Sequence, residues 1–163
     1  MAKKDIIDYL ETIMEESHLE FDWSTQWNKR QHIIEVFFTI YAETEPDLVI
    51  QDIEGTVNKE NIIQFEDAIC FFDPTKSKII PENYLAALPF DLKKGIKKGF
   101  LDAVIKMLRI VVTEGQSDLL DFATDPEIET FELHWNELNF ETTIQTAKDT
   151  NRYDMDRVEY PKF

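Results

Sequence analysis

Few residues in this sequence have the types and spacing that nucleophilic catalysis needs. The single cysteine, Cys70, lies in an apolar stretch, and catalysis by its thiolate would need His18, His32 or His134 beside it. Ser117 lacks the second glycine of a nucleophile elbow, so we interpret it as a helix cap. A thiol in an apolar strand usually behaves as a small buried side chain. The sequence therefore predicts no catalytic residue.

Templates for phosphate and metal binding are also absent from the sequence. Gly95 and Gly99 are the nearest glycine pair, and they match neither the dinucleotide fingerprint nor the P-loop. No zinc-type cysteine or histidine spacing occurs. A segment that begins like a calcium loop at Asp149 has Asp154 where glycine is needed and Tyr160 where glutamate is needed. We expect no cofactor and no metal, with a carboxylate cluster from separate elements as the open alternative.

The one local anomaly is a group of basic residues after Pro89, which we take as a candidate anion-binding or partner-binding site: Lys93, Lys94, Lys97, Lys98, Lys106 and Arg109. On a helix, Lys94, Lys98, Asp102, Lys106 and Arg109 would form one stripe. Three interpretations stay open. The stripe is a solvated or internally paired face, a contact for a partner protein or second copy, or a small-anion site that uses free N–H groups at the helix start.

The charge of the chain is strongly negative and unevenly distributed. There are 33 acidic and 17 basic residues, so the formal charge is 17 − 33 = −16. Residues 5–28 contain seven acids and no base, and residues 110–147 contain nine acids and no base. Such a surface repels phosphate backbones and anionic lipids, so we expect neither nucleic-acid nor membrane binding. The acidic surface has three interpretations: it keeps the protein soluble, it binds a basic partner, or it mimics nucleic acid.

Length and composition predict one soluble domain in the cytoplasm. The chain has 163 residues, of which 43% are hydrophobic, and this content argues against wholesale disorder. One cysteine cannot form an internal disulfide, and no window has the roughly 18 apolar residues of a membrane span. The N-terminus also lacks the apolar stretch of a secretion signal. We expect a single α+β domain over residues 1–150 and a polar C-terminal tail over 151–163.

The spacing of hydrophobic residues predicts where helices and strands lie along the chain. Helical spacing predicts a helix over 6–14 capped by Asp5, a second over 100–112 ended by Gly115, a short one from Ser117 to residue 122, and one capped by Asn136. Alternation predicts strands near 19–23, 32–42, 48–53, 62–72, 83–88 and 131–135, with a turn at Gly55 and Asn58. The fold class is α+β: a mainly antiparallel sheet of about five to six strands, with helices packed on one face and the N-terminal helix first.

The aromatic residues of the predicted strands exceed what one sheet face easily hides. They are Trp23, Trp27, Phe37, Tyr41, Phe71 and Phe72. We expect most of them in the core, and a face left bare would mark an interface.

Three segments carry a resemblance to a known family. They run from Phe65-Glu66-Asp67 to Phe71-Phe72-Asp73-Pro74, from Tyr84 to Pro89 with Lys93-Lys94-Gly95, and from Asp118-Leu119-Leu120-Asp121-Phe122 to Asp125-Pro126. With these segments the chain resembles the domain-of-unknown-function 3013 family of Gram-positive bacteria over nearly its whole length. The resemblance implies a stand-alone cytoplasmic protein, and it implies no catalytic residue because no activity is assigned to the family.

The missing catalytic signatures favour a non-enzymatic protein-binding or adaptor module, whose partner is another protein or a second copy of the chain. Two alternatives remain. One is a small enzyme with a dispersed carboxylate and histidine site, and the other is a nucleic-acid mimic.

Overall fold

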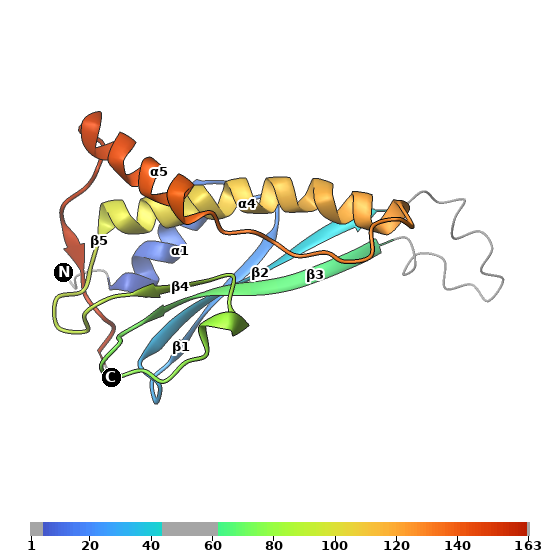
Figure 1. Ribbon diagram of the computed structural model, residues 1–163. Helices are drawn as coiled ribbons and strands as arrows, with labels where there is room; N and C mark the ends of the chain where they lie inside the picture. The colour runs from blue at the N-terminus through green and yellow to red at the C-terminus, as the bar shows by residue number, and fades with distance from the viewer. Residues whose placement is uncertain (1–4, 44–61, 163) are drawn as a thin grey trace.

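The structure, a computed structural model, describes residues 5–162 except 44–61. Its α-helices lie on one side of a four-stranded sheet, and a short 3-10 helix, η1, lies on the other (Figure 1). This is an α+β fold that begins with a helix, as expected. The elements are α1 (Ile6–Glu16), β1 (Asp22–Asn28), β2 (Ile33–Glu43), β3 (Ile62–Phe72), η1 (Pro81–Asn83), β4 (Ala86–Pro89), β5 (Ile96–Lys97), α4 (Lys98–Thr124), α5 (Glu137–Asp149) and β6 (Arg157–Val158).

Helix α1 begins at a capping box, which confirms the predicted cap. The Asp5 carboxylate accepts the Asp8 N–H at 2.8 Å, and the Asp8 carboxylate accepts the Asp5 N–H at 3.4 Å. One stripe of the helix, which contains Ile6, Leu10 and Met14, is fully buried. The local sequence is therefore sufficient to start this helix and to orient it on the core.

Of the two long central strands, β2 largely follows the predicted alternation, whereas β3 has four consecutive buried residues, Ala68 to Phe71. In β2 the side chains of Ile34, Val36 and Ile40 are buried on the face that the helices cover, and Phe37 on the other face is half-buried. Strands β1, β2 and β3 pair antiparallel in the order β1-β2-β3-β4. Strand β3 has the predicted bounds of 62–72.

The sheet is mixed, so the prediction of one mainly antiparallel sheet of five to six strands is only partly right. Strand β4 pairs parallel to β3, and β5 and β6 form a separate two-stranded sheet. The connection between β3 and β4 returns across the outer face of the sheet instead of turning back in a hairpin. Buried Asp73 fixes its start, because its carboxylate accepts the N–H groups of Thr75 and Leu92 at 2.8 and 3.0 Å.

This connection also covers part of the sheet face opposite the helices. The Tyr84 hydroxyl donates to Glu35 of β2 at 2.7 Å, and the Ser77 hydroxyl donates to the His32 carbonyl at 3.0 Å. Of the six aromatic residues of the strands, Phe71 is fully buried and Tyr41 is 39% exposed. Most of these aromatic rings are thus at least half-buried, and the outer sheet face is only partly open.

The predicted helix end at Gly115 and the predicted second helix from Ser117 are wrong. Helix α4 runs without interruption to Thr124 and ends before Pro126. Gly115 is buried, and a Cβ there would lie 2.3 Å from Cδ2 of Leu133. The glycine therefore accommodates a side chain from later in the sequence and does not end the helix.

The segment that contains Phe131, Leu133 and Trp135 shows the predicted alternation but forms no strand. These three side chains are half-buried, and Glu132 and His134 between them are exposed. These half-buried side chains pack against other elements of the fold. The centroid of the Phe131 ring lies 4.9 Å from the centroid of the Phe65 ring. Within the described part of the chain this segment has no strand partner, so the alternation reflects side-chain packing and not sheet pairing.

The C-terminal residues return to the body of the molecule. Helix α5 has the predicted cap, since Asn136 Oδ1 accepts the Asn139 N–H at 3.0 Å. Strand β6 then pairs antiparallel with β5, and Val158 is buried. The Glu159 carbonyl accepts the Ile6 N–H at 2.9 Å. The segment predicted as a polar tail over 151–163 thus contains a short strand and a buried residue.

The strand predicted over 48–53 and the turn at Gly55 and Asn58 lie outside the described residues. No helix in the described part of the chain has the length and apolar character needed to cross a membrane.

The two buried glycines of α4 allow a matched stability test. Alanine favours a helix over glycine by about 1 kcal/mol, but a Cβ on Gly99 would lie 2.8 Å from the Asp154 backbone nitrogen and 2.7 Å from the Tyr153 ring. We expect Gly99→Ala to lower the free energy of unfolding by about 1–3 kcal/mol. Gly115→Ala meets only a terminal methyl of Leu133, so we expect a change below about 1 kcal/mol. Urea unfolding measures both, and equal effects would contradict the different packing.

The ionised form of Asp73 should stabilise the fold. Burial acts to raise the pKa of Asp73, but hydrogen bonds from Leu92 and Thr75 outweigh it and hold the pKa below its ordinary value. Its contribution is therefore complete above the ordinary carboxyl pKa of about 3.9 and is lost as the pH falls through the folded-state pKa. We expect Asp73→Asn to cost about 1.5–3 kcal/mol at pH 7. Wild type should lose stability as the pH falls from about 4 to about 2, and the variant should lose less over that range.

Urea unfolding at several pH values measures this difference. Asp118→Asn, which changes the same charge at an exposed helix position, is the control. A difference between Asp73→Asn and wild type that stays constant from pH 7 to pH 2 would contradict the assigned role.

Candidate functional site

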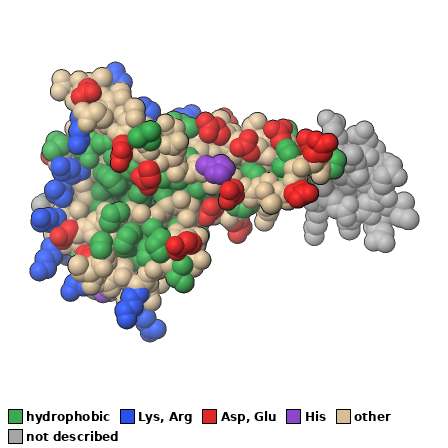
Figure 2. All heavy atoms as spheres, in the orientation of Figure 1, with side chains coloured by type: hydrophobic (Ala, Val, Ile, Leu, Met, Phe, Trp, Pro, Cys, Tyr) green, Lys and Arg blue, Asp and Glu red, His purple; other side chains and the backbone are tan. Residues whose placement is uncertain are grey.

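A mainly apolar pocket of about 220 Å³ lies where β4, β5, the start of α4 and residues 153–157 meet. We call it the β5–α4 pocket. Figure 2 shows apolar side chains gathered on this part of the molecule, with Lys and Arg side chains along the adjoining edge. Phe90, Phe100 and Tyr153 supply aromatic lining, and Lys97 and Arg157 are the basic residues in the lining.

Two close backbone approaches build this pocket. Gly95 has φ +75°, and a Cβ there would lie 2.2 Å from the Val158 carbonyl oxygen, so only glycine fits beside β6. Phe90 follows β4 and donates its N–H to the Phe72 carbonyl at 2.8 Å. The Phe100 ring packs edge-on against Phe140 of α5 at 5.5 Å between centroids. The aromatic lining is therefore held by three separate parts of the chain.

Lys97 and Arg157 are directly opposite each other in the β5–β6 pairing, so they extend from the same face of that small sheet. Like charges at opposite positions of two paired strands repel and destabilise the pairing. A carboxylate placed between these two side chains would relieve that repulsion. The β5–β6 pairing therefore places two positive charges in the lining of the pocket.

The turn that joins β4 to β5 adds two more cations next to the pocket. Lys93 and Lys94 are exposed, and their N–H groups donate to Asp91 Oδ1 at 2.7 and 3.2 Å. Asp91 lines the pocket too, and these bonds engage one of its carboxylate oxygens within the turn. Lys93, Lys94 and Lys97 thus lie near one another, although Lys93 and Lys94 are outside α4.

Tyr153 remains a neutral phenol in the pocket at physiological pH. Burial raises the pKa of Tyr153, Arg157 opposes that shift, and Asp102 adds to it. The Lys148 Nζ atom lies 5.1 Å from the centroid of the Tyr153 ring. The aromatic lining therefore presents apolar faces and a neutral hydroxyl to a ligand.

Two of the backbone N–H groups at the start of α4 already have partners. The Lys98 N–H donates to the Asp156 carbonyl at 2.7 Å, and the Gly99 N–H donates to the Asp154 carbonyl at 2.8 Å. These two donors are therefore engaged within the chain, which reduces what the helix start offers to the predicted small-anion site.

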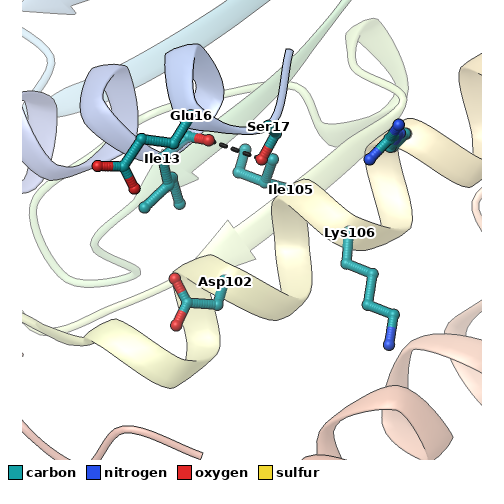
Figure 3. Close-up of a pocket in the computed structure, with 7 residues that line it drawn as sticks. Ile13, Glu16, Ser17, Asp102, Ile105 and Lys106 are labelled. Carbon is teal, nitrogen blue, oxygen red and sulfur yellow. Dashed lines mark hydrogen bonds between the residues drawn. The ribbon is translucent and has the colours of Figure 1, made fainter. Parts of the chain in front are cut away.

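The remaining predicted basic residues lie on another side of α4, so the single stripe that includes Lys94 is wrong. Lys106 and Arg109 line a groove of about 430 Å³ between α1 and α4 (Figure 3). Lys98 lies on the same helix with its Nζ atom 5.6 Å from the Tyr9 ring centroid. In Figure 3 the Lys106 side chain extends away from α1. The groove contains Glu16 as well, so its charge is mixed.

Asp102 also lines this groove and is exposed at the surface. The Tyr9 hydroxyl donates to Asp102 at 2.6 Å. Burial raises the pKa of Asp102, with a further contribution from Asp154, while the Tyr9 hydrogen bond and Lys98 oppose the shift. The interactions of Asp102 thus join α1 to α4, which makes a structural role sufficient to explain its position.

Cys70 is poorly suited to nucleophilic catalysis. The thiol is fully buried, and burial together with nearby Glu35 raises the pKa of Cys70 to about 12. The neighbouring polar group is Tyr84, whose hydroxyl donates to Glu35 at 2.7 Å. At neutral pH the thiolate population is therefore very small.

The histidines assemble no metal centre within the described residues. His134 lies in a separate groove of about 280 Å³ with Asp118, Asp121 and Glu132, and all four side chains are exposed. Active-site acids and bases usually lie in a cleft that excludes water, and these side chains do not. This groove is nevertheless where a dispersed carboxylate and histidine site would lie.

The chain is similar to a known family and to a solved structure. The family model described as "Protein of unknown function (DUF3013)" matches residues 1–162. The chain belongs to this family. A crystal structure of a conserved protein of unknown function from Enterococcus faecalis is similar over 99% of this chain and 98% of that chain, with 36% sequence identity and a TM-score of 0.84. No curated protein matches the chain.

Membership of the family confirms the resemblance seen in the sequence and supplies no activity. The residues that sequence reasoning missed are Phe90, Tyr153 and Arg157. They come from segments far apart in the chain, and nothing in their local spacing marks them as neighbours. The only available signal was the cluster of lysines from Lys93 to Lys97, which lies beside the pocket.

The reactivity of Cys70 directly tests the conclusion that its thiol is poorly suited to nucleophilic catalysis. At pH 7.5 we expect a disulfide reagent to modify native Cys70 on the order of a thousandfold more slowly than the unfolded chain, because its pKa is raised to about 12. Absorbance of the released thiolate measures both rates. A small free thiol serves as the control for reagent activity, and rapid labelling of the native protein would contradict the assignment.

Proposed function

We propose that this protein is a non-enzymatic, cytoplasmic protein-binding module that holds an acidic segment with an apolar anchor in the β5–α4 pocket. The observation that carries the proposal is the placement of Lys97 and Arg157 at opposite positions of the β5–β6 pairing. A bound carboxylate offsets their mutual repulsion, and Phe90 and Phe100 offer apolar surface to an adjacent side chain.

Charge distribution supports this choice of ligand. The chain as a whole carries −16, yet Lys97 and Arg157 line the pocket, and Lys93 and Lys94 lie in the turn that contributes Asp91 and Gly95 to it. Local positive charge on an acidic protein directs an anionic ligand to one place, because it is repelled elsewhere. Of the residues predicted as an anion or partner site, Lys93, Lys94 and Lys97 therefore contribute to binding of the anionic ligand. Lys106 and Arg109, which lie in another groove, serve as the comparison for tests of that binding.

Among the described residues, the groove that contains His134 brings a histidine together with carboxylates, so the enzyme alternative would act there. Its side chains are exposed, and we rank this alternative below the binding function because a general acid or base usually lies in a desolvated cleft with a matched pKa. Nucleic-acid mimicry would use the acidic surface of residues 110–147 and needs no pocket.

A peptide titration tests the binding function. The probe is a short fluorescein-labelled glutamate-rich peptide with one central isoleucine, and the measurement is fluorescence anisotropy. We expect binding that weakens at least about tenfold when alanine replaces the isoleucine, since an apolar side chain buried in a pocket contributes about 1.5–3 kcal/mol. A peptide in which lysine replaces glutamate should not bind.

Matched variants locate the site of binding. We expect Lys97→Gln with Arg157→Gln to weaken peptide binding about tenfold or more while leaving the fold equally or more stable, because the repulsion between the two cations is removed. Lys106→Gln with Arg109→Gln makes the same charge change in the α1–α4 groove and should leave affinity within about twofold. Equal weakening by both pairs, or no binding of any acidic peptide, would contradict the proposed function.

A further inference from the structure

The acidic part of the chain contains a segment with the chemistry that the β5–α4 pocket would take. Among the described residues, seven large hydrophobic side chains are exposed, and four of them lie within the base-free stretch 110–147: Ile110, Leu120, Ile128 and Leu138. Ile128 differs from the other three because it lies outside the helices. It is preceded by Glu127 and followed by Glu129, and both carboxylates are exposed.

The backbone presents this tripeptide in a fixed turn just after α4. The Glu127 N–H donates to Asp125 Oδ1 at 2.9 Å, and the Ile128 N–H donates to the Asp125 carbonyl at 3.1 Å. Ile128 is 37% exposed. Residues 127–129 therefore form a pre-ordered acidic segment with one aliphatic side chain available at the surface, and binding them requires little loss of backbone entropy.

The pocket and this segment are complementary in charge and in polarity. The pocket offers about 220 Å³ lined in part by Phe90 and Phe100, which is enough for one branched aliphatic side chain. Lys97 and Arg157 would lie beside the two glutamates that flank Ile128. Carboxylate bonds to Lys and Arg are among the stronger hydrogen bonds of proteins.

The two surfaces cannot meet within one molecule. Lys97, in the pocket, immediately precedes α4, and residues 127–129 follow its end. Helix α4 has 27 residues, which at 1.5 Å per residue separates its ends by about 40 Å. Figure 1 shows α4 as one straight helix along the molecule, with β5 at one end and the chain leaving for residues 125–136 at the other. Only a second copy can bring the segment to the pocket.

We infer that the acidic segment 127–129 of one molecule binds the β5–α4 pocket of a second copy, so that the protein associates head to tail. This inference rests on the proposed function and names its partner. Because the two contacting surfaces differ, each pair of molecules keeps one free pocket on one copy and one free segment on the other, and association continues into longer chains or closes into a ring. The net charge of −16 on each copy opposes association, so we expect a weak interaction.

Sedimentation velocity over a range of concentrations tests the inference. We expect the mean mass of wild type to rise from the monomer value of 19.2 kDa to above that of a dimer. A pocket variant, Lys97→Gln with Arg157→Gln, and a segment variant, Glu127→Gln with Ile128→Ala and Glu129→Gln, should each remain monomeric. Circular dichroism confirms that both variants are folded.

Mixing the two variants gives the most specific result. The pocket variant retains its segment and the segment variant retains its pocket, so an equimolar mixture should form a 1:1 dimer and nothing larger. Glu137→Gln with Glu141→Gln, which removes two exposed acids on α5, is the control and should associate like wild type.

Three results would overturn the inference. They are a wild type that stays monomeric at every concentration, a mixture that stays monomeric while wild type associates, and loss of association in the α5 control to the same degree. If wild type stays monomeric but the glutamate-rich peptide still binds the pocket, the inference fails and the proposed function stands.

Discussion

The first turn of α4 is held by carbonyl groups from near the other end of the chain, and this end of the molecule depends on that contact. The first N–H groups of any helix have no partner within the helix. Asp5 and Asn136 supply side-chain acceptors for α1 and α5. Lys97 precedes α4 and supplies none, so the carbonyls of Asp154 and Asp156 take that role. Gly99 makes the approach possible, because any side chain there would collide with Tyr153 and the Asp154 backbone.

The same contact assembles the candidate site. This contact places Tyr153 in the pocket and Arg157 opposite Lys97. The structure therefore combines favourable backbone hydrogen bonds with two like charges at opposite strand positions. In the function proposed above, an anionic ligand offsets the repulsion between these two cations. The acidic remainder of the chain both solubilises the protein and limits where an anion can bind.

Local signals in the sequence were sufficient for some elements and not for others. The capping residues Asp5 and Asn136 and the alternation of β2 depend on neighbours a few residues away, and they predicted those elements correctly. Gly115 was misinterpreted as a helix end because its partner, Leu133, lies in a later segment. The parallel pairing of β4 and the pocket had no local signal either, since Lys97 meets Arg157 only through the β5–β6 pairing. The lysines stood out in the sequence, but where α4 begins decides that Lys93, Lys94 and Lys97 precede the helix and that Lys98, Lys106 and Arg109 lie on it.

Hydrogen exchange of two backbone amides tests most directly whether the C-terminal segment closes the start of α4. Measured by NMR, the Lys98 and Gly99 amides should exchange slowly, with protection comparable to that of Leu108 in the interior of α4, because both are bonded to the carbonyls of residues 154 and 156. If these two amides exchange as fast as the unpaired amides of an open helix end while Leu108 stays protected, the segment does not hold the helix. The pocket built on that contact would then be without support.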